Sequence, residues 1–263
     1  MKIVVITGST RGIGYGLADA FLGLGCGVVV SGRTQAAIDP VVARLGVKHE
    51  AQRVRGQPCD VTDYAQVEAL WAAARTHFGQ VDIWINNAGI AHPVSDFEKL
   101  SPEQVKSIVE TNILGTMYGS RVALTGMRAQ GFGSLYNLEG LGSSGGRQVR
   151  GLSVYGTSKA ALRYLNDALM LEAKGTPIIV GALQPGMTVT DMLTRQYEGQ
   201  PEAWEKFKPI LNILADRVEV VAPWLAQQVL ANTRSGARIA FSGGGRTAWR
   251  FLTAPFVRRH VVD

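Results

Sequence analysis

The run KIVVITGSTRGIG, from Lys2 to Gly14, is the stretch that predicts the fold. Its first half is a short β-branched run, typical of a strand buried in a parallel sheet, and a helical pattern follows its glycines. In this context a glycine-rich turn binds a pyrophosphate, because glycines allow close backbone approach and the helix N-terminus supplies free N–H groups. The residues that we predict to contact a dinucleotide here are Gly8, Ser9, Thr10, Arg11, Gly12, Ile13 and Gly14.

Strand and helix patterns alternate along the rest of the chain. Further strands are expected at 27–31, 52–59, 81–85, 134–138, 177–183 and 238–241. This alternation predicts a parallel sheet with helices on both faces, a doubly wound three-layer α/β Rossmann fold. Right-handed crossovers then place the carboxyl ends of the strands on one edge, where such folds bind ligands. We predict one domain over 1–263, with a substrate lid at about 187–215 and an aromatic, arginine-rich tail at about 246–263.

The composition excludes several classes of protein. Of the 263 residues 46% are apolar and 18% are charged, which is enough to form a core and argues against disorder. No apolar run reaches transmembrane length, and the first residues lead into a glycine-rich turn, so we expect neither a membrane span nor a signal peptide. Cys26 and Cys59 show no metal-ligand or disulfide spacing. We therefore expect no metal site, and a reduced, cytoplasmic setting is favoured.

The net charge of +6 and the pI of about 9.5 favour anionic small-molecule ligands. Lysine and arginine are scattered, whereas a nucleic-acid binder usually carries a basic stripe with interleaved aromatic residues. At the end of the second expected strand, Ser31, Gly32 and Arg33 include no acid. A carboxylate there would bind the ribose 2′-hydroxyl of NAD, whereas an arginine pairs with the 2′-phosphate of NADP. Arg33, together with Arg11, therefore predicts NADP(H) as the cofactor.

A candidate proton donor is Tyr155, which lies four residues before Lys159 in an expected helix at 153–171. Residues four apart lie on one face of a helix, one turn from each other. A phenol has an ordinary pKa of about 10, and a cation held close lowers that pKa. The pair is therefore suited to give a proton to, or take one from, the oxygen of a carbonyl or an alcohol. A lone Tyr-x-x-x-Lys match is weak evidence, so its weight depends on the other motifs.

Taken in order, the motifs resemble those of the short-chain dehydrogenase/reductase superfamily over nearly the whole chain. They are TGSTRGIG at 7–14, Asp60-Val61, NNAG at 86–89, Asn112, YGTSK at 155–159 and Pro185-Gly186. The resemblance implies that Tyr155 is the acid or base, that Lys159 holds the nicotinamide ribose and lowers the pKa of the tyrosine, and that Asn112 anchors a proton-relay water. Besides the glycine-rich loop and Arg33, the cofactor-binding residues are then Asp60, Val61, Asn87, Ala88, Gly89, Tyr155, Lys159, Pro185, Gly186 and Thr188.

The loop after the fifth strand departs from the family pattern. Most members have Asn-x-Ser-Ser there, and one serine polarises the substrate carbonyl, whereas this chain has NLEGLGSS at 137–144. When the positions are counted forward from Asn137, Glu139 and Gly140 occupy the places of the two serines. When they are counted back from Tyr155, Gly142 occupies the place of the serine that polarises the carbonyl, and Ser143 is next to it. The loop is about two residues longer than usual, and the two counts leave the register open.

Three explanations for the missing serine stay open. In the first, Ser143 swings in from the longer loop and donates a hydrogen bond to the substrate oxygen. In the second, Glu139 is desolvated against the nicotinamide, stays protonated and donates, because burial raises a carboxyl pKa. In the third, Glu139 only pairs with Arg147 or Arg150, and the glycines make room for a large substrate.

The same loop resembles the chlorophyll b reductase branch of the superfamily, whose members have an acid-Gly-x-Gly-Ser segment at this place. That resemblance implies NADPH-dependent reduction of the 7-formyl group of chlorophyll b, or of another bulky aldehyde or ketone. A second interpretation is a catalytically silent NADP-binding protein that senses redox state or binds a partner, because fold alone does not establish activity. A third is a peripheral membrane protein whose tail lies on anionic lipid, although such a tail more often packs on a neighbouring subunit.

The partners expected from the sequence are a small carbonyl or alcohol substrate and further copies of the chain. The expected helices at 112–128 and 153–172 carry apolar residues on more than one face: Ile113, Leu114, Met117, Val122, Leu162, Leu165, Leu169 and Met170. A helix that is apolar beyond one stripe needs a second packing partner. Because closed symmetric assembly is the usual answer, we expect a homodimer or a homotetramer, with neither nucleic acid nor an integral membrane segment.

Overall fold

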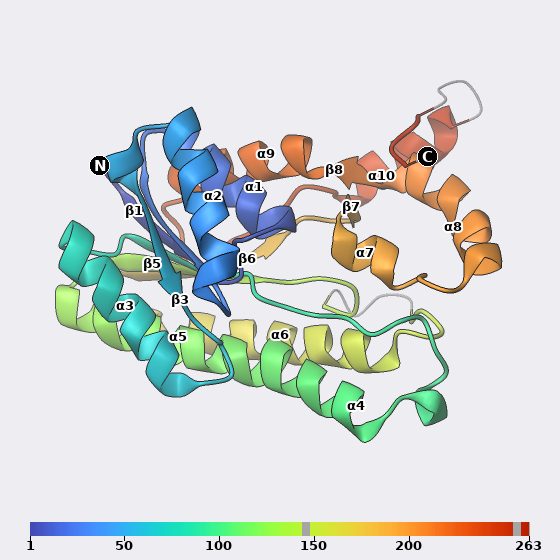
Figure 1. Cartoon of the computed structure of the whole chain (residues 1–263), viewed down its shortest axis with the longest axis horizontal. Helices are drawn as coiled ribbons and strands as arrows, with labels where there is room; N and C mark the ends of the chain where they lie inside the picture. The colour runs from blue at the N-terminus through green and yellow to red at the C-terminus, as the bar shows by residue number, and fades with distance from the viewer. Residues whose placement is uncertain (144–147, 255–258, 263) are drawn as a thin grey trace.

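The protein is built around one parallel sheet (Figure 1). The computed structural model describes residues 1–143, 148–254 and 259–262. Within these residues the main sheet has seven strands in the order β3-β2-β1-β4-β5-β6-β9, all parallel. Their bounds are β1 Ile3–Ile6, β2 Gly27–Gly32, β3 Val54–Pro58, β4 Ile83–Asn86, β5 Gly133–Leu138, β6 Ile178–Gln184 and β9 Arg238–Ala240. The doubly wound parallel sheet predicted from the sequence is confirmed.

Helices cover both faces of the sheet, as Figure 1 shows. One layer contains α1 Gly12–Gly23, α2 Gln35–Lys48 and α9 Val218–Ala231. The opposite layer contains α3 Tyr64–Phe78, α4 Pro102–Ile108, α5 Gly115–Gln130 and α6 Ser153–Glu172. Short 3₁₀ turns lie at Ala51–Arg53 and Phe97–Lys99. Within the described part of the chain, no helix has the length and hydrophobicity that crossing a bilayer requires.

The continuous apolar runs of the central strands supply two cores at once. All four residues of β1 are buried, and Val4 and Ile6 pack with α1 and α9 on one side. Val5, between them, packs with α3 and α5 on the other side. Successive side chains of a strand point to opposite faces, so a strand covered on both faces must be apolar throughout. Burial of these side chains, at roughly 1.5–3 kcal/mol each, holds the three layers together.

The order of the strands reverses beside β1, which lies between β2 and β4. At such a point the loops after neighbouring strands leave in opposite directions, and ligands bind in the crevice between them. The glycine-rich loop after β1 and the NNAG loop after β4 border this crevice. The topology therefore brings the two most glycine-rich motifs of the sequence to one place.

The segment 187–215, predicted as a substrate lid, shows no strong periodicity in its sequence, yet it is largely ordered into short elements. It contains β7 Thr188–Val189, α7 Asp191–Arg195 and α8 Pro201–Leu214. In α8, Trp204, Phe207 and Leu211 nevertheless recur at helical spacing and pack into a small separate core. A proline at the first helical position starts that helix without losing a needed N–H group.

The tail also contains a helix. Gly243, Gly244 and Gly245 interrupt the apolar pattern of the sequence, but α10 Gly244–Thr253 begins among them and extends into the tail, which continues through 259–262. Arg250 and Arg259 both bond to the buried carboxylate of Asp216, which lies in β8 Asp216–Arg217 beside β7. The described tail therefore packs on the segment 187–217 of its own chain, and its contact with a neighbouring subunit stays a prediction. Residues 255–258 and 263 of the predicted tail lie outside the described residues.

Candidate active site

The glycine-rich loop has a geometry that only glycine satisfies. Gly8 and Gly12 have φ of 61° and 56°, in the left-handed region that disfavours side chains. A Cβ on Gly14 would lie 2.4 Å from Asn87 Nδ2, and a Cβ on Gly8 would lie 2.8 Å from Ala88 Cα. The loop therefore packs directly on the residues that follow β4. No side chain stands between its backbone and the crevice at these glycines, as a pyrophosphate site requires.

Asn87 ties the two loops together. Its Nδ2 donates hydrogen bonds to the carbonyl oxygens of Thr7 and Gly8, both at 2.9 Å. In return Thr7 Oγ1 accepts from the backbone N–H groups of Asn87 and Ala88 at 3.0 and 3.1 Å. Thr7 is buried, and its anchoring role was not predicted from the sequence. These bonds fix the shape of the crevice before any ligand binds.

The end of β2 presents cations and no acid. Ser31 is buried and turned inward, because its N–H donates to Ser9 Oγ and its hydroxyl donates to the Ile6 carbonyl. Arg11 and Arg33 are exposed, and neither pairs with a carboxylate in the described residues. Unpaired guanidinium groups at this end fit the charge of a 2′-phosphate.

The other predicted cofactor residues follow the carboxyl ends of several strands of the sheet. Asp60, after β3, accepts hydrogen bonds from the N–H and the hydroxyl of Thr62. Thr188 donates to the Pro185 carbonyl at 3.4 Å after β6, and Gly186 turns the chain with φ of 73°. Thr10 lies against Gly32, and Val61 lies against Gly115. Gly89 lies against Asn112, and Ile13 packs on the core beneath α1. This edge of the sheet thus carries the glycine-rich loop, Asp60-Val61, the NNAG loop and Pro185-Gly186.

Tyr155 and Lys159 lie one turn apart on α6 and are both buried, at 9% and 4% exposure. Lys159 Nζ donates to the Leu138 carbonyl at 3.0 Å and lies 6.0 Å from the centroid of the tyrosine ring. Burial raises the pKa of Tyr155 to about 12. Burial also lowers the pKa of Lys159 to about 8, and the charge of Glu139 acts against that fall.

The direction for Tyr155 is opposite to the lowered pKa expected from the sequence. The reason is that desolvation of the phenol outweighs the effect of an ammonium group that faces a backbone carbonyl. At neutral pH the phenol of this structure is protonated, and it is therefore ready to donate. Lys159, with a pKa near 8, is the group of the pair whose charge changes close to neutrality.

Asn112 lies in a π-helical turn, Val109–Leu114, that separates α4 from α5. The sequence pattern from Ser101 to Arg128 predicts one continuous helix, and the structure interrupts it with this wider turn. π-turns inside α-helices are often found at functional sites. Asn112 is fully buried: its Oδ1 accepts from the Ile90 N–H, and its Nδ2 donates to the Ile90 carbonyl and to Ser158 Oγ. Ser158 in turn donates to the Tyr155 carbonyl at 2.7 Å, so Asn112 braces the helix that carries the tyrosine.

The register of the loop after β5 follows from its contacts. A Cβ on Gly140 would lie 3.0 Å from Tyr155 Oη, whereas a Cβ on Gly142 would lie 2.3 Å from the Gly156 carbonyl oxygen. Gly140, counted from the asparagine, is therefore the residue whose side chain would face the tyrosine hydroxyl. Ser143 is buried; its hydroxyl donates to the Lys159 carbonyl and accepts from the Gly140 N–H, both at 3.0 Å. These bonds attach the loop to α6, and the substrate-donor role of Ser143 stays a prediction.

Glu139 is buried at the end of β5, and its carboxylate has partners that the sequence did not indicate. Oε1 accepts from Asn166 Nδ2 at 2.8 Å, and Oε2 accepts from Gln184 Nε2 at 2.6 Å. Arg238 Nε lies 3.6 Å from Oε1. Of the two arginines proposed as its partners, Arg150 is wrong because it forms a two-fold ion pair with Asp96. The other, at 147, lies outside the described residues.

Sequence reasoning missed this polar network, although one signal was present. Asn166 follows Lys159 by seven residues, which is two turns along the same face of α6. An asparagine is mildly unfavourable inside a helix, so its place on the face of the lysine could have indicated a polar contact. Gln184 and Arg238 could not be found this way, because they come from β6 and β9 and meet Glu139 only through the sheet.

Comparisons with known proteins agree with this geometry. The chain is 36% identical over 240 residues to the protein named chlorophyll(ide) b reductase NOL, chloroplastic, of Arabidopsis thaliana, covering 89% of this chain and 67% of that protein. It spans 52% to 67% of the length of the relatives that carry chlorophyll(ide) b reductase names. The resemblance to chlorophyll b reductases predicted from the sequence is confirmed.

Solved structures with the same fold were crystallised with nicotinamide cofactors. A variant of actinorhodin polyketide ketoreductase with NADPH is 28% identical, with a TM-score of 0.81 and coverage of 92% of this chain and 96% of that one. The 3-ketoacyl-(acyl-carrier-protein) reductase of Brucella melitensis with NADH is 27% identical, with a TM-score of 0.77 and coverage of 94% and 98%. The two together indicate a nicotinamide dinucleotide without choosing between its forms. Residues 2–201 match the family described as short chain dehydrogenase, and the chain belongs to this family of oxidoreductases.

Proposed function

We propose that this oxidoreductase is an NADPH-dependent reductase of a bulky aldehyde or ketone. The observation that carries the proposal is the buried Tyr155–Lys159 pair at the carboxyl edge of the sheet, beside the glycine-rich crevice. The 7-formyl group of chlorophyll b or chlorophyllide b is the preferred substrate class, because the relatives with 36% identity carry chlorophyll(ide) b reductase names. The absence of a side chain on Gly140 beside the tyrosine hydroxyl supports a large substrate.

When bound, NADPH supplies the hydride that reduces the carbonyl carbon. Tyr155 gives its proton to the substrate oxygen, where negative charge develops, and the protonated form that burial favours suits this direction. Lys159 in its ammonium form stabilises the phenolate left behind and holds the nicotinamide ribose. Asn112 keeps α6 in place through Ser158 and anchors a proton-relay water. Ser143, or a backbone or water donor in its place, completes the binding of the substrate oxygen.

The proposed activity is tested by mixing the protein with NADPH and a panel of carbonyl compounds and following the nicotinamide absorbance. The panel contains chlorophyllide b, its 7-methyl counterpart chlorophyllide a as the matched control, and simple aldehydes and ketones. We expect oxidation of NADPH with chlorophyllide b and none with chlorophyllide a. Turnover of simple carbonyls alone would reject the tetrapyrrole but keep the reductase. Tight NADPH binding with no turnover of any carbonyl would favour the silent sensor instead.

Cofactor selection is the first part of the proposal that a single substitution tests. Arg33→Asp removes a cation from the 2′-phosphate and places a carboxylate where NAD-specific folds have one. A hydrogen bond to a charged group contributes about 1.5–3 kcal/mol, so affinity for NADPH should fall about 10- to 100-fold while that for NADH rises. The matched control is Arg55→Asp. Arg55 is an exposed arginine of β3 that pairs with Val29 in the first half of β2, away from the end of that strand. Wild-type protein that prefers NADH would contradict the proposal.

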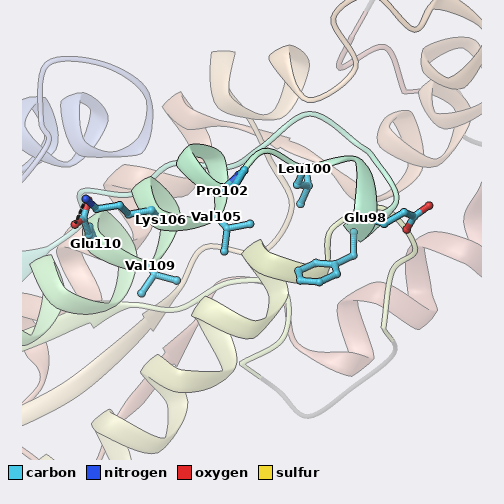
Figure 2. A pocket seen from close by; sticks show the side chains of 8 residues that line it. Glu98, Leu100, Pro102, Val105, Lys106, Val109 and Glu110 are labelled. Carbon is cyan, nitrogen blue, oxygen red and sulfur yellow. Dashed lines mark ion pairs between the residues drawn. The ribbon is translucent and has the colours of Figure 1, made fainter.

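The proposed assembly is a homodimer or homotetramer through the α4–α6 layer. Apolar side chains of this layer stay exposed, among them Met117, Tyr164 and Leu171. An open groove of about 630 Å³ runs along α4 between Phe97 and Glu110, lined by Val105 and Val109 (Figure 2). Apolar side chains exposed on such helices, with an apolar-lined groove beside them, are typical of an interface. Light scattering at micromolar concentration should give two or four times the chain mass of 28.3 kDa. A measured mass equal to that of one chain would reject the assembly.

The setting and the moving parts complete the proposal. Segment 187–215 acts as the lid over the substrate, because Thr190 lies against Gly12 of the cofactor loop and α8 follows it. The chain works as one NADP-binding domain.

A cytoplasmic location is supported by the two free cysteines, Cys26 and Cys59, although the relatives with chlorophyll(ide) b reductase names are chloroplastic. Localisation of a tagged full-length protein in its own cell tests this part.

A further inference from the structure

A directed chain of hydrogen bonds ends at the carboxylate of Glu139. Trp84 Nε1 donates to Asn86 Oδ1, and Asn86 Nδ2 donates to Asn137 Oδ1, both at 2.8 Å. Asn137 Nδ2 then donates to Asn166 Oδ1 at 2.7 Å, and Asn166 Nδ2 donates to Glu139 Oε1 at 2.8 Å. The four hydrogen bonds of this series all run in the same direction, from donor to acceptor towards the acid, and successive bonds aligned like this polarise one another.

The register of β4 and β5 places the asparagines of this hydrogen-bond series side by side. Asn86 and Asn137 are Cα partners at the ends of β4 and β5, and their side chains lie on the face that α5 and α6 cover. Both are nearly or fully inaccessible, at 4% and 0% exposure, as is Asn166 at 0%. Three buried carboxamides are costly unless all are hydrogen-bonded, so their joint placement demands a partner for the last N–H. Glu139, 1% exposed, is that partner.

The carboxyl group of Glu139 accepts a second amide hydrogen bond besides the one from Asn166. Oε2 accepts from Gln184 Nε2 at 2.6 Å, so both oxygens act as acceptors of amide N–H groups. Hydrogen bonds donated to a carboxylate stabilise its charged form. The guanidinium of Arg238 is close, at 3.6 Å, but it is directed mainly at Asp167 on α6. Both oxygens of Glu139 are therefore held by protein amide groups.

We propose that Glu139 is a positioning residue, a fixed buried anion that keeps Lys159 protonated, and that the amide chain from Trp84 holds this anion in place. The inference rests on the proposed function in assigning Lys159 its catalytic task. Lys159 Nζ donates to the carbonyl of Leu138, the residue before Glu139, so the ammonium is bound beside the carboxylate's own backbone. No direct ion pair joins these two described residues, and the carboxylate acts through space.

Lys159 needs such a counter-charge. It is 4% exposed, and desolvation disfavours its ammonium form. The charge of Glu139 raises the pKa of Lys159 against that effect, leaving it at about 8. The ionisable groups around the pair are Tyr155 on the same helix, Arg238 on β9, and Asp167 and Arg163 on α6. Among these Arg238 opposes Glu139, and Asp167 compensates Arg238.

The test measures the pKa of Lys159 directly, by ¹³C NMR of the full chain labelled at lysine Cε, without cofactor. The Lys159 signal is assigned by its loss in Lys159→Arg. We expect Glu139→Gln to lower the pKa of Lys159 by about one unit, because an opposite charge nearby is worth about 1–3 units. The matched control is Asp167→Asn, which removes an equal charge from α6, the helix that carries Lys159. We expect it to shift the pKa of Lys159 several-fold less. An unchanged Lys159 pKa in folded Glu139→Gln would overturn the inference.

Two further variants keep the test decisive. Glu139→Asp preserves the charge, and the Lys159 pKa should return towards wild type, which a role in packing alone does not predict. Should Glu139→Gln not fold, Arg238→Leu replaces it: freeing Glu139 from its competing cation should raise the Lys159 pKa, and no change would contradict the inference. Circular dichroism and thermal unfolding check that each variant is folded.

Activity supplies the second readout and separates this inference from the proposed function. Lys159 supports catalysis only when charged, so turnover should fall as pH rises through its pKa. In Glu139→Gln this alkaline limb should move to lower pH by the same amount as the NMR titration. If the Lys159 pKa shifts in Glu139→Gln but the protein reduces no carbonyl, the proposed reductase is rejected and the role of Glu139 as a buried anion is kept. If the protein reduces carbonyls but neither the Lys159 pKa nor the alkaline limb shifts in Glu139→Gln, the reductase is kept and the role of Glu139 is rejected.

Discussion

Tyr155→Phe should lower turnover by about 10²- to 10⁴-fold, the contribution of a positioned general acid. The phenol is 9% exposed, and burial raises its pKa to about 12, so it carries its proton throughout the neutral range. Removing only the hydroxyl leaves the ring and its packing on α6. The substrate oxygen gains charge in the transition state, so the loss should fall on kcat and not on the affinity for NADPH.

The measurement is steady-state reduction of the substrate that the carbonyl panel identifies, with NADPH binding followed by quenching of protein fluorescence. Tyr164→Phe is the matched control, because Tyr164 lies on the same helix but is 80% exposed, away from the buried pair. Retention of more than about a hundredth of wild-type turnover in Tyr155→Phe would remove the tyrosine from the role of acid, given the size expected of such a group.

Lys159→Ala should reduce both turnover and cofactor affinity, and turnover by about 10²-fold or more, as for loss of a donor that stabilises developing charge. The ammonium group is proposed to bind the ribose and to stabilise the phenolate, so its removal damages two steps. Lys159 is 4% exposed and donates to the Leu138 carbonyl, which also loses its partner in the variant. Stability should therefore fall by about 1–3 kcal/mol, the cost of an unsatisfied buried polar group.

The control is Lys174→Ala, which removes an exposed lysine just beyond the end of α6. Kinetics are measured at a temperature at which calorimetry shows Lys159→Ala to be folded, so that lost activity is not lost structure. Wild-type turnover should fall as pH rises through about 8, where Lys159 loses its charge. Unchanged NADPH affinity in Lys159→Ala would reject the ribose contact and leave the electrostatic role to be judged by kcat.

The fold and the location of the crevice could be predicted from local pattern. Apolar runs such as 3–6 and 27–32 form strands buried on both faces, and their alternation with helical segments permits few topologies. Gly8 and Gly12 have positive φ, a local backbone requirement, so the glycine pattern alone indicated a tight turn before a helix. Tyr155 and Lys159 are one turn apart in any helix, so their pairing could be predicted from the sequence alone.

Other properties of the site came from residues distant in sequence. Arg150 was a candidate partner of Glu139, eleven residues away, but the sheet instead brings Gln184 and Arg238 to this carboxylate. The direction of the Tyr155 pKa was wrong for a similar reason: proximity to a cation is local, whereas desolvation is the sum of everything packed around the helix. The tail likewise met its partner only in the folded chain, where Arg250 and Arg259 reach Asp216.

What the sequence by itself determined is therefore the strands of the main sheet with the helices between most of them, the parallel arrangement of those strands, and the presence of an acid–cation pair beside a glycine-rich turn. These depend on backbone preferences and on periods of two and 3.6 residues, which act over a few positions. Only the tertiary structure decided which charges are buried together and which partners satisfy them. Burial and electrostatic interaction depend on distance in space, and strand register and layer packing set that distance between residues such as Asn86, Asn137 and Glu139.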